Sequence, residues 1–274
     1  MNASFFSVPT YAKRRLLEHG FWLFGVLMGV LSACSSENDK PKADEPMHTL
    51  IFMDKSLSLN TNQAYAAQKY GQLLDDIVKN NVRTTGDQIT VYYIHENTAK
   101  ARALSLTVRT EMDDVTNASP TDVEAAQAAF DLALQREKAR FRKQLGNKMA
   151  QTNEAVSNQR TDILASLSVI ADAAADGQLL SVYYFSDMVE SMPVRPGSAT
   201  ARDFHKTPPA NDGQADEWAK ADAKQLGDLE LGSPSVRIVL PFEPTASRRV
   251  NNPTVTRYWR TLFAQFGADD LEEE

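Results

Sequence analysis

The chain has 274 residues, of which 42% are apolar and 24% charged, so it is long enough for a full domain and too apolar for wholesale disorder. Its formal net charge of −7 argues against a general affinity for nucleic acid. The single cysteine, Cys34, excludes an intramolecular disulfide.

The N-terminal segment predicts a lipoprotein leader. A basic stretch at residues 13–15 precedes the apolar run Phe21 to Leu31, which is too short to span a membrane as a helix. The sequence Leu31-Ser32-Ala33-Cys34 resembles the bacterial lipobox, in which the cysteine is lipidated and becomes the first mature residue. We therefore expect a leader over 1–33, a lipidated Cys34 with a flexible tether to residue 47, and anchorage in the bacterial cell envelope, facing the periplasm or the cell surface. The alternative is a plain signal peptide or short anchor with an incidental cysteine.

From residue 48 onward, short apolar strands alternate with amphipathic helices, a pattern typical of an α/β fold with an open, doubly wound, mostly parallel sheet covered on both faces. The second and third strands are separated by so few residues that they should pair antiparallel at one edge. We expect strands at 48–53, 88–95, 103–109, 179–186 and 236–242, and helices at 62–79, 120–151, 162–175, 215–226 and 255–266. The domain should span 48–268, followed by a disordered acidic tail over 269–274.

The helix expected from residue 120 belongs to a long insertion over about 120–160 and is strongly basic in its second half. Two interpretations stay open: a packed helix with a solvated charged face, or a protruding arm that contacts an acidic partner. Its basic residues are Arg136, Lys138, Arg140, Arg142, Lys143 and Lys148.

Polar side chains follow two apolar strands and precede one helix. Asp54, Ser56 and Ser58 come after the first strand, Thr161 stands just ahead of an apolar helix, and Asp187 follows the strand 179–186. Ligands of open α/β sheets collect at the carboxyl ends of the strands, where the strand order reverses, so the two carboxylates should meet there. Carboxylate and hydroxyl oxygens suit Mg²⁺. Each residue alone could equally be a turn former or a helix N-cap.

Together these five residues resemble the von Willebrand factor A (vWA) domain and its metal-ion-dependent adhesion site (MIDAS). That family has DxSxS after the first strand, a distant Thr, and an Asp after the fourth strand. The resemblance covers about residues 48–268. It implies that Mg²⁺ (or Mn²⁺ or Ca²⁺) is bound directly by Ser56 and Ser58, directly or through water by Thr161, and largely through water by the carboxylates. The metal would keep an open position for an acidic group of a protein partner.

The resemblance has two departures and one further implication. The gap between Ser58 and Thr161 is long for the family, and Met188 stands where the family commonly has glycine. The family topology places the C-terminal end of the long helix, near 145–160, and the loop after Asp187 beside the metal. In that loop Arg202, Asp203 and His205 could help to select a ligand, or could belong to an ordinary solvated loop.

These observations favour a membrane-anchored adhesion or assembly protein that binds a divalent cation and is not an enzyme. A second hypothesis is a metal-independent scaffold subunit that uses the basic helix 121–150. A Mg²⁺-dependent phosphohydrolase with Asp54 as nucleophile is less favoured, because Ser56 stands where such phosphatases usually carry a second Asp. No serine-hydrolase, zinc-protease, P-loop or dinucleotide motif is present in the sequence.

Overall fold

The computed structural model describes residues 45–56, 63–151, 160–192, 202–243, 246 and 251–274. The leader, Cys34, most of the expected tether, and Ser58 lie outside the described residues. Residues Ala43–Glu274 form one compact unit that contains every strand of the sheet and both apolar clusters described below. Within the described part of the chain, no helix is long and apolar enough to cross a membrane.

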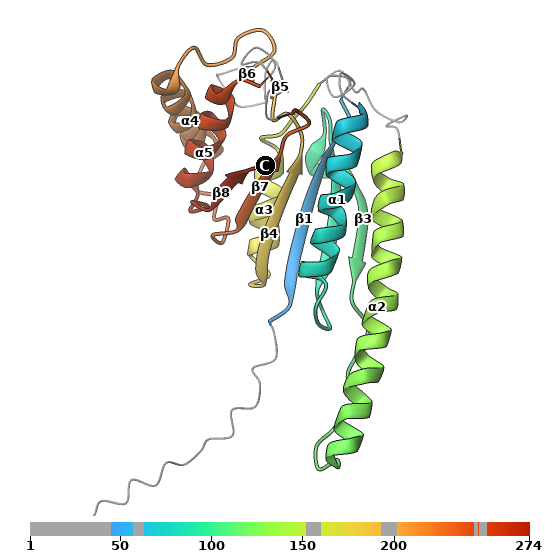
Figure 1. Ribbon diagram of the computed structural model, residues 1–274. Coiled ribbons are helices and arrows are strands. Elements are labelled where there is room, and N and C mark those ends of the chain that lie inside the picture. Colours follow the sequence, from blue (N-terminus) through green and yellow to red (C-terminus); the bar gives the residue numbers. More distant parts are fainter. Residues whose placement is uncertain (1–44, 57–62, 152–159, 193–201, 244–245, 247–250) are drawn as a thin grey trace, which may run out of the picture. The chain divides into compact units, whose positions relative to one another are not determined.

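The unit is built on a six-stranded sheet with the strand order β3-β2-β1-β4-β7-β8 (Figure 1). Only β3 pairs antiparallel, with β2, so the expected mostly parallel α/β sheet with one antiparallel edge strand is confirmed. From β1 the chain adds strands on one side and then returns to add β4 on the other, so the order reverses between β1 and β4. The strands are β1 (Met47–Asp54), β2 (Gln88–Ile94), β3 (Arg102–Thr107), β4 (Leu179–Phe185), β7 (Ser235–Val239) and β8 (Leu271–Glu273).

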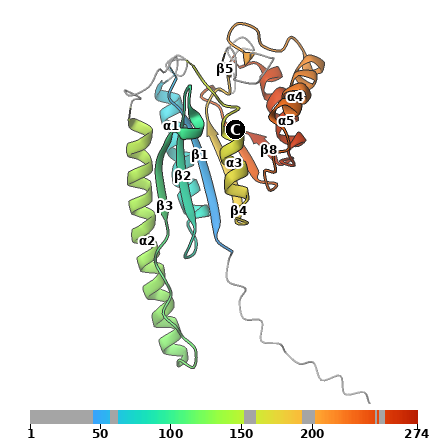
Figure 2. The same ribbon diagram turned by 180° about the vertical axis from the view of Figure 1, so that it is seen from behind.

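Helices cover both faces of this sheet (Figures 1 and 2). Successive side chains of β1 point to opposite faces, so Leu50 and Phe52 enter one apolar cluster while Ile51 and Met53 enter the other. The first cluster packs against α3 (Ser166–Ala174) and α5 (Pro253–Gln265), and against α4 (Asp212–Leu226). The second packs against α1 (Gln63–Asn81) and α2 (Pro120–Ala150). Burial on both faces explains the nearly continuous apolar sequence of β1.

The helix boundaries follow local signals in the sequence. Ser119 caps α2, since its side chain accepts a hydrogen bond from the N–H of Asp122, and Pro120 occupies the first turn. Asn211 and Asn252 cap α4 and α5 in the same way. The predicted long helix is therefore confirmed, with α2 running from Pro120 to Ala150.

The acidic C-terminus differs from the prediction. Residues 269–274 were expected to form a tail outside the domain, yet Leu271–Glu273 form β8, parallel to β7. Leu271 is buried in the core, and the N–H of Glu274 donates to the carbonyl oxygen of Ile238 at 2.8 Å. The side chain of Arg237 pairs with Glu272, so opposite charge offsets the acidity that suggested disorder.

Removing residues 271–274 is expected to lower the free energy of unfolding by about 1–3 kcal/mol, because Leu271 and the β8 backbone hydrogen bonds are lost. It also leaves β7 as an uncovered edge, which favours aggregation. Urea unfolding of the unit Ala43–Glu274 measures the first effect and light scattering the second. Glu273→Gln, which keeps the strand, should stay within about 0.5 kcal/mol of wild type. Equal stability of the truncated and complete chains would contradict the role of β8.

A short two-stranded sheet, β5 (Ser191–Met192) and β6 (Arg202–Asp203), lies in the segment that was expected to be all loop. Two-residue strands carry no periodicity that a sequence pattern can detect. Their pairing brings the residues after Asp187 back toward α4.

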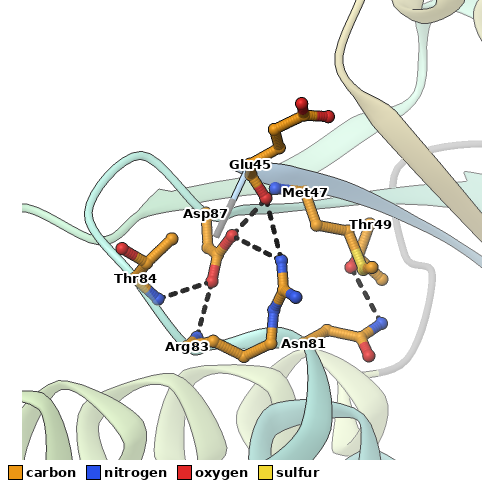
Figure 3. A network of polar contacts seen from close by, with 7 residues as sticks. All are labelled: Glu45, Met47, Thr49, Asn81, Arg83, Thr84 and Asp87. Carbon is orange, nitrogen blue, oxygen red and sulfur yellow. Dashed lines mark hydrogen bonds and ion pairs between the residues drawn. The ribbon is translucent and has the colours of Figure 1, made fainter. Parts of the chain in front are cut away.

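At the opposite end of the strands, a buried aspartate joins three elements (Figure 3). Asp87, fully buried, accepts hydrogen bonds from the N–H groups of Met47, Arg83 and Thr84. These residues belong to the start of β1 and to the turn between α1 and β2. One carboxylate therefore fixes the edge of the sheet that lies away from Asp54.

Candidate functional site

Two buried carboxylates lie at the carboxyl ends of β1 and β4, the neighbouring strands between which the strand order reverses. Asp54 is the last residue of β1 and Asp187 lies two residues beyond β4. The Asp54 carboxylate accepts a hydrogen bond from the Ser186 hydroxyl at 2.7 Å and one from the N–H of Ser56 at 2.8 Å. The structure thus brings Asp54, Ser56 and the Ser186–Asp187 pair together at one edge of the sheet.

The negative charges of Asp54 and Asp187 repel each other at this edge. Burial, together with the nearby negative charge of Asp187, raises the pKa of Asp54 to about 7, although hydrogen bonds from Ser56 and Ser186 oppose the rise. A buried carboxylate with a second one close by is costly unless a cation or a proton compensates it.

A polar group on α1 is buried within electrostatic range of the same two carboxylates. The hydroxyl of Tyr70 is buried and has no hydrogen-bond partner among the described residues. Burial and the negative charges of Asp54 and Asp187 together raise its pKa well above the usual value. An unpaired buried hydroxyl beside two carboxylates is the environment that a hydrated divalent cation would complete. The donor set at this edge therefore fits Mg²⁺, with hard oxygen atoms only.

The side chain of Lys55, next to Asp54, contacts the C-terminal end of α2. Its ammonium donates a hydrogen bond to the carbonyl oxygen of Met149 at 2.6 Å and lies 5.3 Å from the centre of the Tyr93 ring. The Tyr93 hydroxyl donates to the carbonyl oxygen of Lys148 at 3.1 Å. The C-terminal end of α2 therefore contacts Lys55, the residue that follows Asp54.

Thr161 contacts the loop that follows Asp187. Its hydroxyl donates to the carbonyl oxygen of Val189 at 2.6 Å and lies 2.8 Å from the hydroxyl of Ser191. Because the single proton of Thr161 goes to Val189, Ser191 is the donor of that second bond, and one lone pair of the Thr161 oxygen is left. In the described part of the chain, no hydrogen bond joins Thr161 directly to Asp54.

Glu190 strengthens the contact between this loop and the start of α3. The side chain is fully buried, and its Oε2 accepts hydrogen bonds from the N–H groups of Ile163 at 2.7 Å and Leu164 at 3.0 Å. A carboxylate at this position also suits the positive end of the α3 dipole. Sequence reasoning missed both Glu190 and Ser191, because a single acid or serine after a strand has no distinctive spacing.

Met188 adopts a backbone conformation that favours glycine, with φ at +58°. The side chain is buried, its N–H donates to the Ser186 hydroxyl at 2.9 Å, and its carbonyl oxygen accepts a hydrogen bond from the Trp259 indole at 2.8 Å. The surrounding contacts thus hold a non-glycine residue in the left-handed region directly after Asp187.

The residues expected to select a ligand have other partners. Arg202 forms a two-pronged contact with Asp222 at 2.7 and 3.1 Å, and Tyr258 donates to the same carboxylate at 2.7 Å. Asp203 pairs with the ammonium of Lys206 at 2.8 Å, while His205 is exposed. Arg202 therefore ties β6 to α4 and α5, and its guanidinium is committed to Asp222.

Ser58 lies outside the described residues, so the structure places four of the five residues of the expected metal site. Across the described ranges, no three His, Cys, Asp or Glu side chains gather as a metal-binding group. A cation at this edge would consequently depend on serine and threonine hydroxyls as well as on the two carboxylates.

Comparisons with known proteins assign no family. No family model matches the chain, and no curated protein matches it. Among solved structures, it is similar to proximal thread matrix protein 1 from the mussel byssus, with 11% identity, 80% of this chain covered and a TM-score of 0.29. The chain spans about half the length of that protein, since 48% of the mussel chain is covered.

Proposed function

We propose that this chain is a lipid-anchored protein of the bacterial cell envelope whose vWA-like domain binds a divalent cation, Mg²⁺ or alternatively Mn²⁺ or Ca²⁺. Through that cation it holds an acidic group of a protein partner. The observation that carries the proposal is the pair of buried carboxylates, Asp54 and Asp187, at the reversal point of the sheet. The lipid anchor rests on the sequence around Cys34 alone.

The chemistry of the site supports the proposal. Asp54, Ser56, Ser58, Thr161 and Asp187 are the residues that would hold the cation, and all of them offer hard oxygen atoms. A bound Mg²⁺ would supply an electrophilic position for an external carboxylate. The Asp54 carboxylate accepts hydrogen bonds from Ser186 and Ser56, and the Thr161 hydroxyl donates to the loop after Asp187, so Asp54 and Thr161 are held in place by the fold itself.

Two features of the fold add support. The strand order, with a single antiparallel strand next to β2, is the arrangement expected from the vWA resemblance. Met188 adopts a left-handed backbone at the position where that family commonly has glycine. A left-handed backbone is one that glycine adopts readily, so the conformation of Met188 is consistent with the resemblance.

Titration of the unit Ala43–Glu274 with Mn²⁺, followed by calorimetry, tests the proposal. We expect one site in the wild type, at least a roughly tenfold loss of affinity in Ser56→Ala, and loss of binding in Asp54→Ala. Asp76→Ala, which removes an exposed carboxylate of α1 away from the site, is the matched control and should bind as wild type. Absence of binding in the wild type, or equal binding by Asp54→Ala, would reject the metal site.

A second candidate function is a scaffold that needs no metal. It is favoured by the exposed basic side chains of Arg136, Arg140 and Lys143 on α2. Crosslinking capture from native membranes separates the two functions. The metal proposal expects the partner to be lost with a chelator, whereas the scaffold expects it to be retained with a chelator and lost when these three basic residues are reversed in charge.

A further inference from the structure

The first half of α2 and the segment before it extend past the end of the sheet (Figures 1 and 2). We call residues 109–133 the arm. The buried side chains of α2 are Leu134, Phe141 and Leu145, all beyond the arm, so the arm contributes none of them. At the end of the arm, Phe130 is partly buried against the second apolar cluster. The rest of this helix half has no buried stripe, so its other faces remain available for another surface.

Exposed apolar side chains concentrate on the arm. Of the four large apolar side chains exposed among the described residues, three lie there: Met112 at 38%, Val123 at 36% and Leu132 at 56%. The fourth is Leu179, at the start of β4. Val123 and Leu132 lie on opposite faces of α2, and Met112 precedes the helix. The face that carries Leu132, the most exposed of them, is therefore the candidate interaction surface.

The arm also carries an open hollow of about 320 Å³. Its lining includes the small side chains of Ala125, Ala126 and Ala129 from α2, here called its floor, and Asp113, Asp114 and Asp122, here called its acidic rim. Small apolar side chains next to carboxylates fit an apolar side chain that is accompanied by a positive charge.

The arm itself presents such a pair of side chains. Leu132 is exposed and lies seven residues from Ala125, so the two share one face of α2 about two turns apart. Arg136, one turn further on, is exposed and makes no ion pair among the described residues. When two copies of α2 run antiparallel about a two-fold axis near Ala128 and Ala129, Leu132 of each copy meets Ala125 of the other. The same register brings Arg136 opposite the acidic rim near Asp122.

We propose that two copies of this chain dock arm to arm in this antiparallel arrangement, with Leu132 of each seated in the alanine-floored hollow of the other. In a two-fold dimer both copies use the same surface, so Leu132 and the hollow that receives it must lie on one surface of the chain. Both lie on the arm. The charges agree, because the acidic rim meets Arg136 and the helix dipoles are opposed. One helix pair is a small interface, so the dimer forms and dissociates over micromolar concentrations. This contact is independent of the proposed metal site.

Sedimentation velocity of the unit Ala43–Glu274 in the presence of a chelator tests the dimer. We expect a concentration-dependent dimer in the wild type and at least a roughly tenfold weaker one in Leu132→Asp and in Arg136→Glu. The combination of Arg136→Glu with Asp113→Arg restores the charge match and should recover association. Leu179→Asp, which changes an exposed leucine outside the arm, is the matched control and should dimerise as wild type. Thermal unfolding of each variant confirms that it is folded.

Single cysteines test the orientation, because the unit contains no cysteine of its own. Ala128→Cys lies near the two-fold axis and should form a disulfide between copies. Ala139→Cys, exposed on the same side of α2, lies three turns from the axis and should not. Equal crosslinking of both would indicate parallel helices and overturn the arrangement. A wild type that is monomeric throughout, or a dimer that Leu132→Asp leaves intact, would overturn the proposal, whatever the outcome of the Mn²⁺ titration.

Discussion

The metal-free domain is expected to lose stability as the pH rises from 5 to 8, by on the order of 2–3 kcal/mol attributable to Asp54. The folded protein holds a proton on this carboxylate that the unfolded chain releases, since its pKa is raised from 3.8 to about 7. Stability from this group is complete below pH 3.8, falls as the unfolded chain ionises, and is lost once the pH passes 7. Urea unfolding at a series of pH values measures the effect.

Two buried histidines act in the opposite direction, so variants are needed to isolate Asp54. Burial lowers the pKa of His48 and of His95, which makes the fold less stable as the pH falls through 6.5. Both histidines are present in wild type and in Asp54→Asn, so the difference between those two pH profiles reports Asp54 together with its interaction with Asp187. Asp187→Asn removes the neighbouring charge and should move the transition of Asp54 to lower pH.

The same shift predicts how a cation acts. Mg²⁺ binds the ionised carboxylate, so it should stabilise the domain more at pH 8 than at pH 5 and should have no effect on Asp54→Asn. Identical pH profiles of wild type and Asp54→Asn in the absence of metal would show that Asp54 does not carry the raised pKa. In that case Asp187, and not Asp54, would hold the proton that relieves the repulsion between the two carboxylates.

The site was partly visible in the sequence because its residues stand at strand ends. Asp54 ends one strongly apolar strand and Asp187 follows another, and parallel strands bring their carboxyl ends to one edge. Their partners were not visible in that way. Ser186 binds Asp54 across 132 positions of sequence, and Glu190 reaches the start of α3 through a loop whose path no periodicity encodes.

The arrangement of the strands and helices was likewise predictable from the sequence only in part. The alternation of strands and helices, and the short link before β3, correctly predicted a mostly parallel sheet with one antiparallel edge strand. The strand β8 was missed because its acidic composition outweighed a single apolar residue, Leu271, in the sequence pattern. Its stability comes from pairing with β7, which composition cannot reveal. Of the two interpretations of α2, the packed helix is supported by Phe141 and Leu145, which are buried in the second apolar cluster. Contact of its basic face with an acidic partner stays a prediction.

The second large effect is expected at Asp87, at the far edge of the sheet (Figure 3). Asp87→Ala should lower the free energy of unfolding by about 3–5 kcal/mol, because it leaves several buried N–H donors without an acceptor. Those donors are the backbone groups of Met47, Arg83 and Thr84, at 2.8, 2.5 and 2.8 Å from the carboxylate. Equilibrium unfolding in urea measures the loss. Asp87→Asn should cost nearly as much, since its amide nitrogen would face donors.

The contribution of the carboxylate as an acceptor can be separated from its ion pair with Arg83. The guanidinium lies 3.6 Å from Asp87 and also donates to the carbonyl oxygen of Glu45 at 3.0 Å. Arg83→Ala removes these contacts but leaves the three backbone hydrogen bonds, so it should cost only about 1 kcal/mol. A loss in Arg83→Ala as large as in Asp87→Ala would mean that the ion pair, and not the backbone acceptor, holds this edge. The Mn²⁺ affinity of folded Asp87→Ala should equal that of wild type, because Asp54 lies at the other end of β1.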